Sequence, residues 1–292
     1  MEKAIKRYFP IFVLPTMIAF TLGFIIPFAE GVYLSFCKFT TVNDAKFIGL
    51  SNYAKVFKDS TFVHAFWYTA AFTVVSVILI NVLAFAVALL LTKGIKGTNV
   101  FRTVFFMPNL IGGIVLGYIW QLLLNGILMK FSRTLTYSST FGFWGLVILM
   151  CWQQIGYMMI IYIAGIQNIP GELVEAAEID GATKRQVLKS VTIPMVMPSI
   201  TVCTFLTLTN SFKLFDQNLA LTNGEPSKMS EMLALNIFNT FYGRAGYEGV
   251  GQAKAVIFFV LVAAIALTQN YLTRRKEVQQ EWKREKRNTV HC

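Results

Sequence analysis

The sequence predicts an all-α membrane protein with six transmembrane helices, and its composition and hydropathy are the two observations that predict it. Of its 292 residues, 55% are hydrophobic and 14% are charged, and the mean hydropathy is +0.57. A chain this apolar does not have the composition of an ordinary soluble domain. Six apolar runs are long enough to cross a hydrocarbon core of about 30 Å as helices. They cover about residues 10–36, 64–92, 103–128, 143–168, 197–219 and 252–273.

The first apolar run is predicted to be a spanning helix rather than a signal peptide. Three basic residues precede it, as in a signal peptide, but the uncharged stretch Tyr8–Ala29 has 22 residues. The apolar region of a signal peptide has about 7–15 residues and ends at an A-x-A-like cleavage site, which is missing here. We therefore expect one transmembrane domain over residues 10–273.

The distribution of basic residues predicts that both termini are cytoplasmic. An even number of spans puts both ends of the chain on one side of the membrane. Of the 26 Lys and Arg residues, 16 lie in segments that the six spans place on that side. These segments are the N-terminus (1–9), the loop 93–102, the loop 169–196 and the basic tail (274–292). Cytoplasmic loops are enriched in Lys and Arg, so the count assigns this side to the cytoplasm.

The loop 169–196 differs from the rest of the chain because seven charged residues lie between positions 172 and 189. Each charge would cost about 2.5–3.5 kcal/mol at the centre of a bilayer, so the loop is expected to stand in water. Its sequence predicts two short helices. The first covers Glu172–Asp180 and ends at Gly181, and a capping box of Thr183 and Gln186 begins the second.

This loop resembles the EAA loop of ABC-importer permeases, whose pattern is EAA, three residues, G, nine residues and I-x-L-P. The chain has Glu175-Ala176-Ala177, then Gly181, then Val191-Thr192-Ile193-Pro194. In that family the loop is a coupling helix that seats in a groove of the cytoplasmic ATPase. The resemblance implies a type I ABC-importer permease fold. It also implies ATPase-coupling roles for Glu175, Ala176, Ala177, Asp180 and Gly181.

Three shorter stretches extend the resemblance over roughly residues 45–270 and point to the carbohydrate-type permeases, which include maltose, multiple-sugar and glycerol-phosphate permeases. They are Phe47–Tyr53 (F-I-G-L-S-N-Y), Phe101–Thr103 with Met107-Pro108, and Leu221–Pro226 (L-T-N-G-E-P). The last stretch departs from the family's L-T-G-G-G-P at two glycine positions.

Polar residues in the fifth predicted span are candidates for function because polar side chains are costly inside a membrane. Asn210, Lys213, Asp216 and Gln217 fall within an arc of roughly 120° on a helix, so they would form one stripe facing a cavity or a partner. Lys213 and Asp216, three residues apart, would neutralise each other.

The fourth predicted span carries Gln153, Gln154 and Tyr157. Gln154 and Asn210 each lie sixteen residues from a proline that bounds the charged loop, so both would lie about 24 Å above it at 1.5 Å per residue. Amides exchange hydrogen bonds with hydroxyl groups, and aromatic rings stack on C–H faces. The two clusters therefore suit a neutral polyhydroxylated ligand such as a sugar. Hydrogen bonding between helices is the alternative role for the amides.

In maltose-type permeases the helices before and after the EAA loop contact the ligand. Alignment on the loop without gaps places a contacting Tyr of that family at Tyr157 and a contacting Asn at Asn210. Neighbouring family contacts fall near positions where the residue types differ. The candidate substrate-binding residues are therefore Tyr157, Asn210, Gln153, Gln154, Thr207, Ser211, Lys213, Asp216 and Gln217.

No motif in the sequence indicates catalysis by this chain. It contains neither the G-x-x-x-x-G-K-[ST] phosphate-binding loop nor the G-x-S-x-G nucleophile motif. Its four cysteines and two histidines lack the spacing of a metal site. We expect the chain to bind no metal or cofactor, and we expect a separate ATPase to bind ATP and Mg²⁺.

The resemblance implies a complex in the cell (inner) membrane of a bacterium. The expected partners are the lipid bilayer, a second homologous permease subunit in a heterodimer, two cytoplasmic ATPase subunits, an external solute-binding protein and a sugar. The net charge of +11 follows from the cytoplasmic segments, so no nucleic-acid partner is expected. Four alternatives stay open: transport of glycerol phosphate, transport of amino acids, phosphonates or metals, a stand-alone secondary transporter with Lys213 and Asp216 as its ion-coupling pair, and a membrane enzyme or receptor, for which the sequence shows no site.

Overall fold

The computed structural model of the chain describes residues 2–94 and 96–290, and it describes side chains at positions 9, 11–94, 96–269 and 271. The side chains of the predicted basic tail (274–292) and of the N-terminal basic residues lie outside the described ones.

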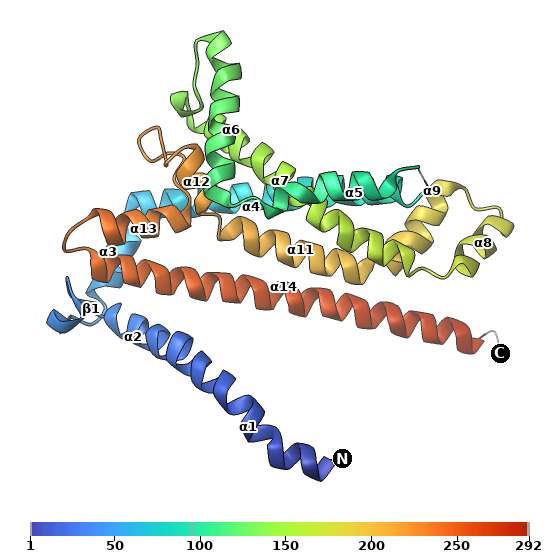
Figure 1. Cartoon of the computed structure of the whole chain (residues 1–292), viewed down its shortest axis with the longest axis horizontal. Helices are drawn as coiled ribbons and strands as arrows, with labels where there is room; N and C mark the ends of the chain where they lie inside the picture. The colour runs from blue at the N-terminus through green and yellow to red at the C-terminus, as the bar shows by residue number, and fades with distance from the viewer. Residues whose placement is uncertain (1, 95, 291–292) are drawn as a thin grey trace. The chain divides into compact units, whose positions relative to one another are not determined.

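Helices make up most of the described chain (Figure 1). The α-helices are α1 (Glu2–Phe20), α2 (Ile26–Leu34), α3 (Ser51–Lys58), α4 (Ser60–Leu91), α5 (Thr98–Phe106), α6 (Gly113–Leu128), α7 (Ser139–Gln167), α8 (Gly171–Ile179), α9 (Lys184–Val187), α10 (Ile193–Met195), α11 (Met197–Phe212), α12 (Asp216–Leu221), α13 (Leu233–Gly243) and α14 (Glu248–Val290). Short π or 3₁₀ segments are η1 (Thr21–Ile25), η2 (Val42–Asp44), η3 (Met107–Leu110), η4 (Met129–Phe131), η5 (Leu135–Tyr137) and η6 (Leu188–Thr192). The strands β1 (Cys37–Lys38) and β2 (Lys46–Phe47) pair antiparallel.

The predicted all-α class with six spans is confirmed. Five described helical stretches are long and apolar enough to cross a membrane: Ile11–Leu34, Ser60–Leu91, Gly113–Phe131, Ser139–Gln167 and Glu248–Gln269. The sixth is a bent pair, Lys184–Met195 and Met197–Phe212, whose two parts meet at 68°. The side of the membrane on which the termini lie stays a prediction.

Two of the predicted spans are broken where the sequence suggested one continuous helix. The third, predicted over 103–128, is divided between α5 and α6 by the 3₁₀ segment η3, which contains Pro108. Proline removes a backbone donor and clashes with the preceding turn, which accounts for the break. The fifth, predicted over 197–219, ends as α11 at Phe212, and α12 begins only at Asp216.

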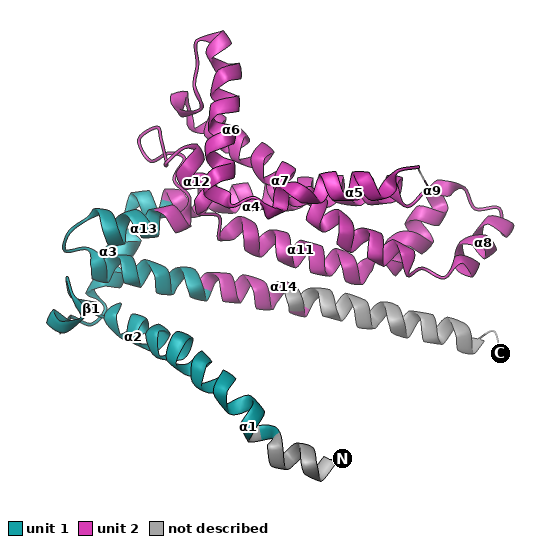
Figure 2. Ribbon diagram, viewed as in Figure 1, with its two compact units in different colours: residues 1–63, 236–260 teal, residues 64–235, 261–292 magenta. Residues whose placement is uncertain are grey.

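The structure divides into two compact units (Figure 2): residues 1–63 with 236–260, and residues 64–235 with 261–292. In the second unit, α7 lies against α5 and α11, while α12 lies against α6. Its core is apolar and centres on α7, which buries Leu146, Leu149, Met158 and Tyr162.

In the first unit, buried polar groups join segments that are distant in sequence. The amide of Asn52, within the motif Phe47–Tyr53, donates to the carbonyl oxygens of Ser35 (2.9 Å) and Cys37 (2.8 Å). Lys254 of α14 is fully buried and forms an ion pair with Asp59 at 2.7 Å. Its ammonium group also donates to Asn236 and Thr240, each at 2.8 Å. These bonds satisfy a charge that would otherwise be costly to bury.

Candidate functional site

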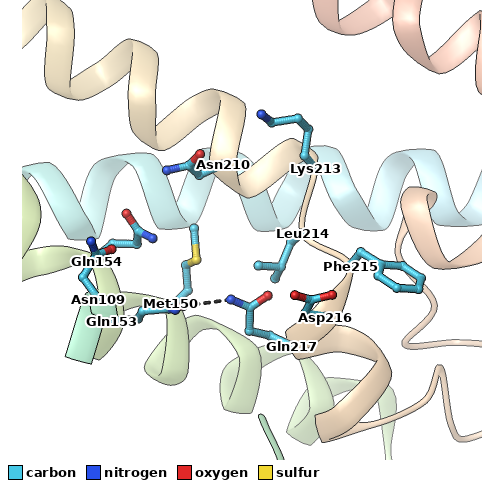
Figure 3. A pocket seen from close by; sticks show the side chains of 10 residues that line it. All are labelled: Asn109, Met150, Gln153, Gln154, Asn210, Lys213, Leu214, Phe215, Asp216 and Gln217. Carbon is cyan, nitrogen blue, oxygen red and sulfur yellow. Dashed lines mark hydrogen bonds between the residues drawn. The ribbon is translucent and has the colours of Figure 1, made fainter. Parts of the chain in front are cut away.

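The second unit contains a cavity of about 450 Å³ at the junction of α7, α11, α12 and η3 (Figure 3). This volume is within the range of small-molecule sites. Seven of its ten lining residues are polar. They are Asn109, Gln153, Gln154, Asn210, Lys213, Asp216 and Gln217, and the other three are Met150, Leu214 and Phe215.

The break after α11 positions the residues of the predicted stripe. α11 ends at Phe212, and α12 starts at Asp216. The three residues between the two helices, Lys213, Leu214 and Phe215, line the cavity. Asn210 and Asp216 therefore lie on separate helices, yet both line the same cavity. The predicted stripe is thus brought together, although the continuous helix on which it was based is wrong.

The expected neutralisation of Lys213 by Asp216 is also wrong. Both residues are described, and they form no ion pair with each other. The reason is the helix end, because a residue three positions along is a neighbour only while the helix continues. The cavity therefore has one cationic and one anionic side chain that are available separately, and both are exposed.

Three glutamine side chains set the polar character of the cavity wall. Gln217 Nε2 donates to Gln153 Oε1 at 2.8 Å (Figure 3), and Gln153 Nε2 reaches the carbonyl oxygen of Ile111 at 3.4 Å. Gln154 differs, since its side chain is 92% buried and its Oε1 atom has no hydrogen-bond partner. A buried acceptor without a partner costs free energy until a donor reaches it.

Three of the predicted site residues lie outside the lining of the cavity. Thr207 is fully buried and accepts a hydrogen bond from Asn81 of α4 at 2.9 Å. Ser211 is also fully buried, and its hydroxyl has no partner. Tyr157 is half-buried and packs near the ring of Phe106, with 6.4 Å between the ring centroids.

Asn109 lines the cavity but was not among the residues predicted from the sequence. It lies in η3, directly after Pro108. A continuous third span would have placed it nearly two turns into a helix, with no reason to face the other polar residues. The proline in the middle of an apolar run was the signal that the backbone breaks at this point.

A second candidate site is the charged hairpin, which has the predicted helix–turn–helix structure. Helix α8 ends at Ile179 with Asp180 as its C-cap residue, and Gly181 adopts a left-handed conformation with φ of +82°. The N–H of Gly181 donates to Glu178 O and that of Ala182 to Ala177 O, both at 3.0 Å. This pattern is the Schellman motif, which favours glycine because a side chain is strained at positive φ.

The second helix of the hairpin begins as predicted. Thr183 N donates to Gln186 Oε1 at 2.7 Å, and Gln186 N donates back to Thr183 Oγ1 at 3.4 Å, which completes a capping box. Helix α9, the π segment η6 and α10 then continue to Met195. The hairpin therefore has a fixed backbone, attached to α7 on one side and to α11 on the other.

The surface of the hairpin is open. Glu175, Ala176, Asp180 and Gly181 are exposed and Ala177 is half-buried. Ile179 is 86% exposed, an unusual position for a large apolar side chain on a charged loop. Sequence reasoning missed Ile179, because the pattern EAA-x3-G leaves its position undefined.

Residues 91–278 match the family described as binding-protein-dependent transport system inner membrane component. The chain is 43% identical over 278 residues to the probable starch degradation products transport system permease protein AmyD of Thermoanaerobacterium thermosulfurigenes, covering 92% of this chain and 94% of AmyD. It is 29% identical over 289 residues to the multiple sugar-binding transport system permease protein MsmF of Streptococcus mutans, covering 95% and 99% of the two chains.

The fold is similar to that of a solved bacterial ABC transporter involved in the import of the acidic polysaccharide alginate. The TM-score is 0.79 at 21% identity, over 94% of this chain and 98% of that one. This similarity confirms the predicted type I permease fold.

Proposed function

This chain belongs to the family of binding-protein-dependent transport system inner membrane components, and from that premise we propose that it is the permease subunit through which an ATP-driven importer moves a sugar or oligosaccharide. The chain is a multi-pass membrane protein and a transporter subunit rather than an enzyme. Two of its relatives are named as permeases for starch degradation products and for multiple sugars.

The cluster of amide side chains that includes Gln154 in the polar cavity is the observation that carries the sugar assignment. The amides of Asn109, Gln153, Asn210 and Gln217 share that cavity. Amides both donate and accept, so they match hydroxyl groups, which also do both. A neutral oligosaccharide would offer many hydroxyl groups at once, whereas a metal ion would need carboxylates or imidazoles.

The charged hairpin is proposed to couple the cavity to ATP hydrolysis in a separate pair of cytoplasmic ATPase subunits, which would bind ATP and Mg²⁺. Glu175, Ala176, Ala177, Asp180 and Gly181 would form the contact. The fixed backbone of the hairpin supports this proposal, since a rigid contact can pass on a displacement to α7 and α11. A second homologous permease subunit and an external solute-binding protein would complete the complex in a bacterial plasma membrane.

A negatively charged solute is the second candidate, because Lys213 lines the cavity without pairing to Asp216. Its chemistry would be that of a small phosphate ester such as glycerol phosphate, which Lys213 would neutralise.

The Gln154→Met variant tests the cavity, with Gln167→Met as a matched control. Gln167 is an exposed residue of the same helix and lies outside the cavity. Loss of one hydrogen bond to a neutral hydroxyl should raise the KM for uptake of a starch-derived oligosaccharide roughly 2- to 12-fold. Uptake would be measured with radiolabelled maltotriose in vesicles that contain the purified complex, and glycerol phosphate would be tested in parallel.

Three results separate the alternatives. A raised KM for maltotriose with Gln154→Met, and an unchanged KM with Gln167→Met, supports the sugar site. An unchanged KM in both variants contradicts it. Uptake of glycerol phosphate but not of maltotriose, abolished by Lys213→Met, would favour the second candidate.

A further inference from the structure

The side-chain amide of Asn81 lies in the longest described apolar span, α4, and outside the cavity. Asn81 belongs to α4, a helix of 32 residues with Phe72, Ile80 and Ala84 fully buried in the core of its unit. Within a membrane no water is available to satisfy a polar side chain, so an amide at this depth requires partners in the protein. Its partners come from both helices to which the charged hairpin is attached.

Asn81 joins α4 to α7 and to α11 through its two amide atoms. Its Oδ1 accepts a hydrogen bond from the hydroxyl of Tyr162 of α7 at 2.7 Å. Its Nδ2 donates to Thr207 Oγ1 of α11 at 2.9 Å and to the carbonyl oxygen of Val77 at 2.8 Å. Tyr162 is 1% exposed and Thr207 is fully buried, while Asn81 itself is half-buried.

The direction of each bond is fixed. A carbonyl can only accept, so the Val77 oxygen requires the amino side of Asn81 to face it. Thr207 donates its own proton to the carbonyl oxygen of Cys203, which leaves its oxygen free to accept from Asn81. The three side chains therefore form one directional chain of hydrogen bonds from Tyr162 through Asn81 to Thr207.

The hydrogen-bond chain lies between the cavity and the charged hairpin. Thr207 is three residues from Asn210, which lines the cavity. Tyr162 is eight residues beyond Gln154 along α7, about 12 Å nearer the hairpin at 1.5 Å per residue. A displacement that starts at the hairpin and travels along either helix must pass this level before it reaches the cavity.

Helices α7 and α11 are also packed closely against each other near this level. The Sγ atom of Cys203 lies 3.7 Å from the carbonyl oxygen of Met158. A methyl group added at Gly165 of α7 would lie 2.3 Å from Ser199 Oγ of α11. The two helices therefore have little room to slide past each other while the hydrogen-bond chain holds both against α4.

We infer that Asn81 is a positioning residue for transport. It fixes α7 and α11 relative to each other, so that movement of the hairpin reaches the cavity through both helices together. The inference rests on the proposed function, because it requires the hairpin to be moved by an ATPase. Without Asn81, Tyr162 and Thr207 lose their common partner, and each helix can respond to the hairpin separately. ATP hydrolysis would then continue while fewer solute molecules cross per ATP.

The test compares Asn81→Leu, Tyr162→Phe and Thr207→Val, which remove the polar atoms with little change in shape. Thr209→Val is the matched control, because Thr209 is in the same helix and its hydroxyl donates within that helix, to Phe205 and Leu206. Stimulated ATPase activity and uptake of radiolabelled maltotriose are measured in the same vesicles with the complete complex. The number of sugars transported per ATP is the readout.

Asn81→Leu should lower the transport-to-ATP ratio about 3- to 20-fold, the range expected for hydrogen bonds between membrane helices. Tyr162→Phe and Thr207→Val should each lower it less. Adding either substitution to Asn81→Leu should change nothing further, because both hydroxyls act through Asn81. Thr209→Val should leave the ratio at the wild-type value.

An unchanged ratio in Asn81→Leu overturns the inference, even if the variant is less stable, because a purely structural role would reduce uptake and ATPase activity together. If Asn81→Leu cannot be purified, unchanged ratios in both Tyr162→Phe and Thr207→Val overturn it. Failure of the wild-type complex to couple ATP to uptake of any solute would instead refute the proposed function.

Discussion

Gly156 of α7 provides the sharpest test of how the cavity wall is built. Helix α5 crosses α7 at this residue, and the backbone of α5 occupies the space where a side chain would be. A Cβ atom at Gly156 would lie 1.8 Å from the carbonyl oxygen of Phe105, 2.2 Å from its carbon and 2.8 Å from the nitrogen of Phe106. All three are backbone atoms, so no side-chain rotation can relieve the contact.

The structure gives the distance by which α5 and α7 must separate in the Gly156→Ala variant. Real Cβ contacts do not fall below 3.0 Å, so α5 and α7 must separate by at least 1.2 Å, the difference between 3.0 and 1.8 Å. Overpacking of this kind costs about 1–3 kcal/mol, and sometimes more. The separation also moves Asn109, which follows α5, away from Gln153 and Gln154 on α7.

Gly126→Ala is the matched control, because nothing lies within 4 Å of a Cβ atom at this helical glycine. Alanine is the better helix former by about 0.5–1 kcal/mol, so this change should be neutral or stabilising. Thermal unfolding in detergent should therefore show a lower midpoint for Gly156→Ala and an unchanged or higher one for Gly126→Ala. Equal midpoints for Gly156→Ala and the wild-type protein would refute the close contact between α5 and α7.

The remaining predictions concern the buried ion pair and the hairpin. Asp59→Asn should cost about 3–5 kcal/mol of stability because it leaves the buried Lys254 without a counter-ion, and adding Lys254→Met should restore most of the loss. Burial alone raises the pKa of the Asp59 carboxyl, but hydrogen bonds from Lys254 and Thr61 outweigh it and lower the pKa to about 2. The unfolding midpoint should therefore fall as the pH drops from about 4 to 2 in the wild-type protein but not in Asp59→Asn, and parallel pH curves would contradict the pairing. Gly181→Pro should abolish coupled transport while leaving membrane insertion intact, because proline cannot adopt φ of +82° and removes the N–H that donates to Glu178. Normal uptake by this variant would rule out the hairpin as the coupling element.

The sequence was sufficient for features that depend on local chemistry. Apolar length predicted the spans, and the capping box of Thr183 with Gln186 and the end of the first helix at Gly181 were legible from neighbouring residues. The common depth of Gln154 and Asn210 also followed from residue counting, and both line one cavity. These features need only helix geometry and the position of the charged loop.

Features that depend on distant partners were not predictable. Asn81 is one amide in a long apolar run, and its role requires Tyr162 and Thr207, which are 81 and 126 residues away. Thr207 is a candidate ligand residue because family contacts fall near its position, and that alignment does not show its hydrogen bond with Asn81. Lys254 pairs with Asp59, which is 195 residues away, so a hydropathy window that contains Lys254 counts its charge without its partner.

ATP-dependent accumulation of radiolabelled maltotriose in vesicles is the most direct test of transport driven by a partner ATPase. The vesicles would contain the chain with its second permease subunit and ATPase, and the solute-binding protein would be added on the outside. We predict uptake that requires both ATP hydrolysis and the solute-binding protein and that continues when a proton ionophore is present. Uptake by the chain without the ATPase, driven by a proton gradient and abolished by the ionophore, would contradict the assignment and indicate a secondary transporter.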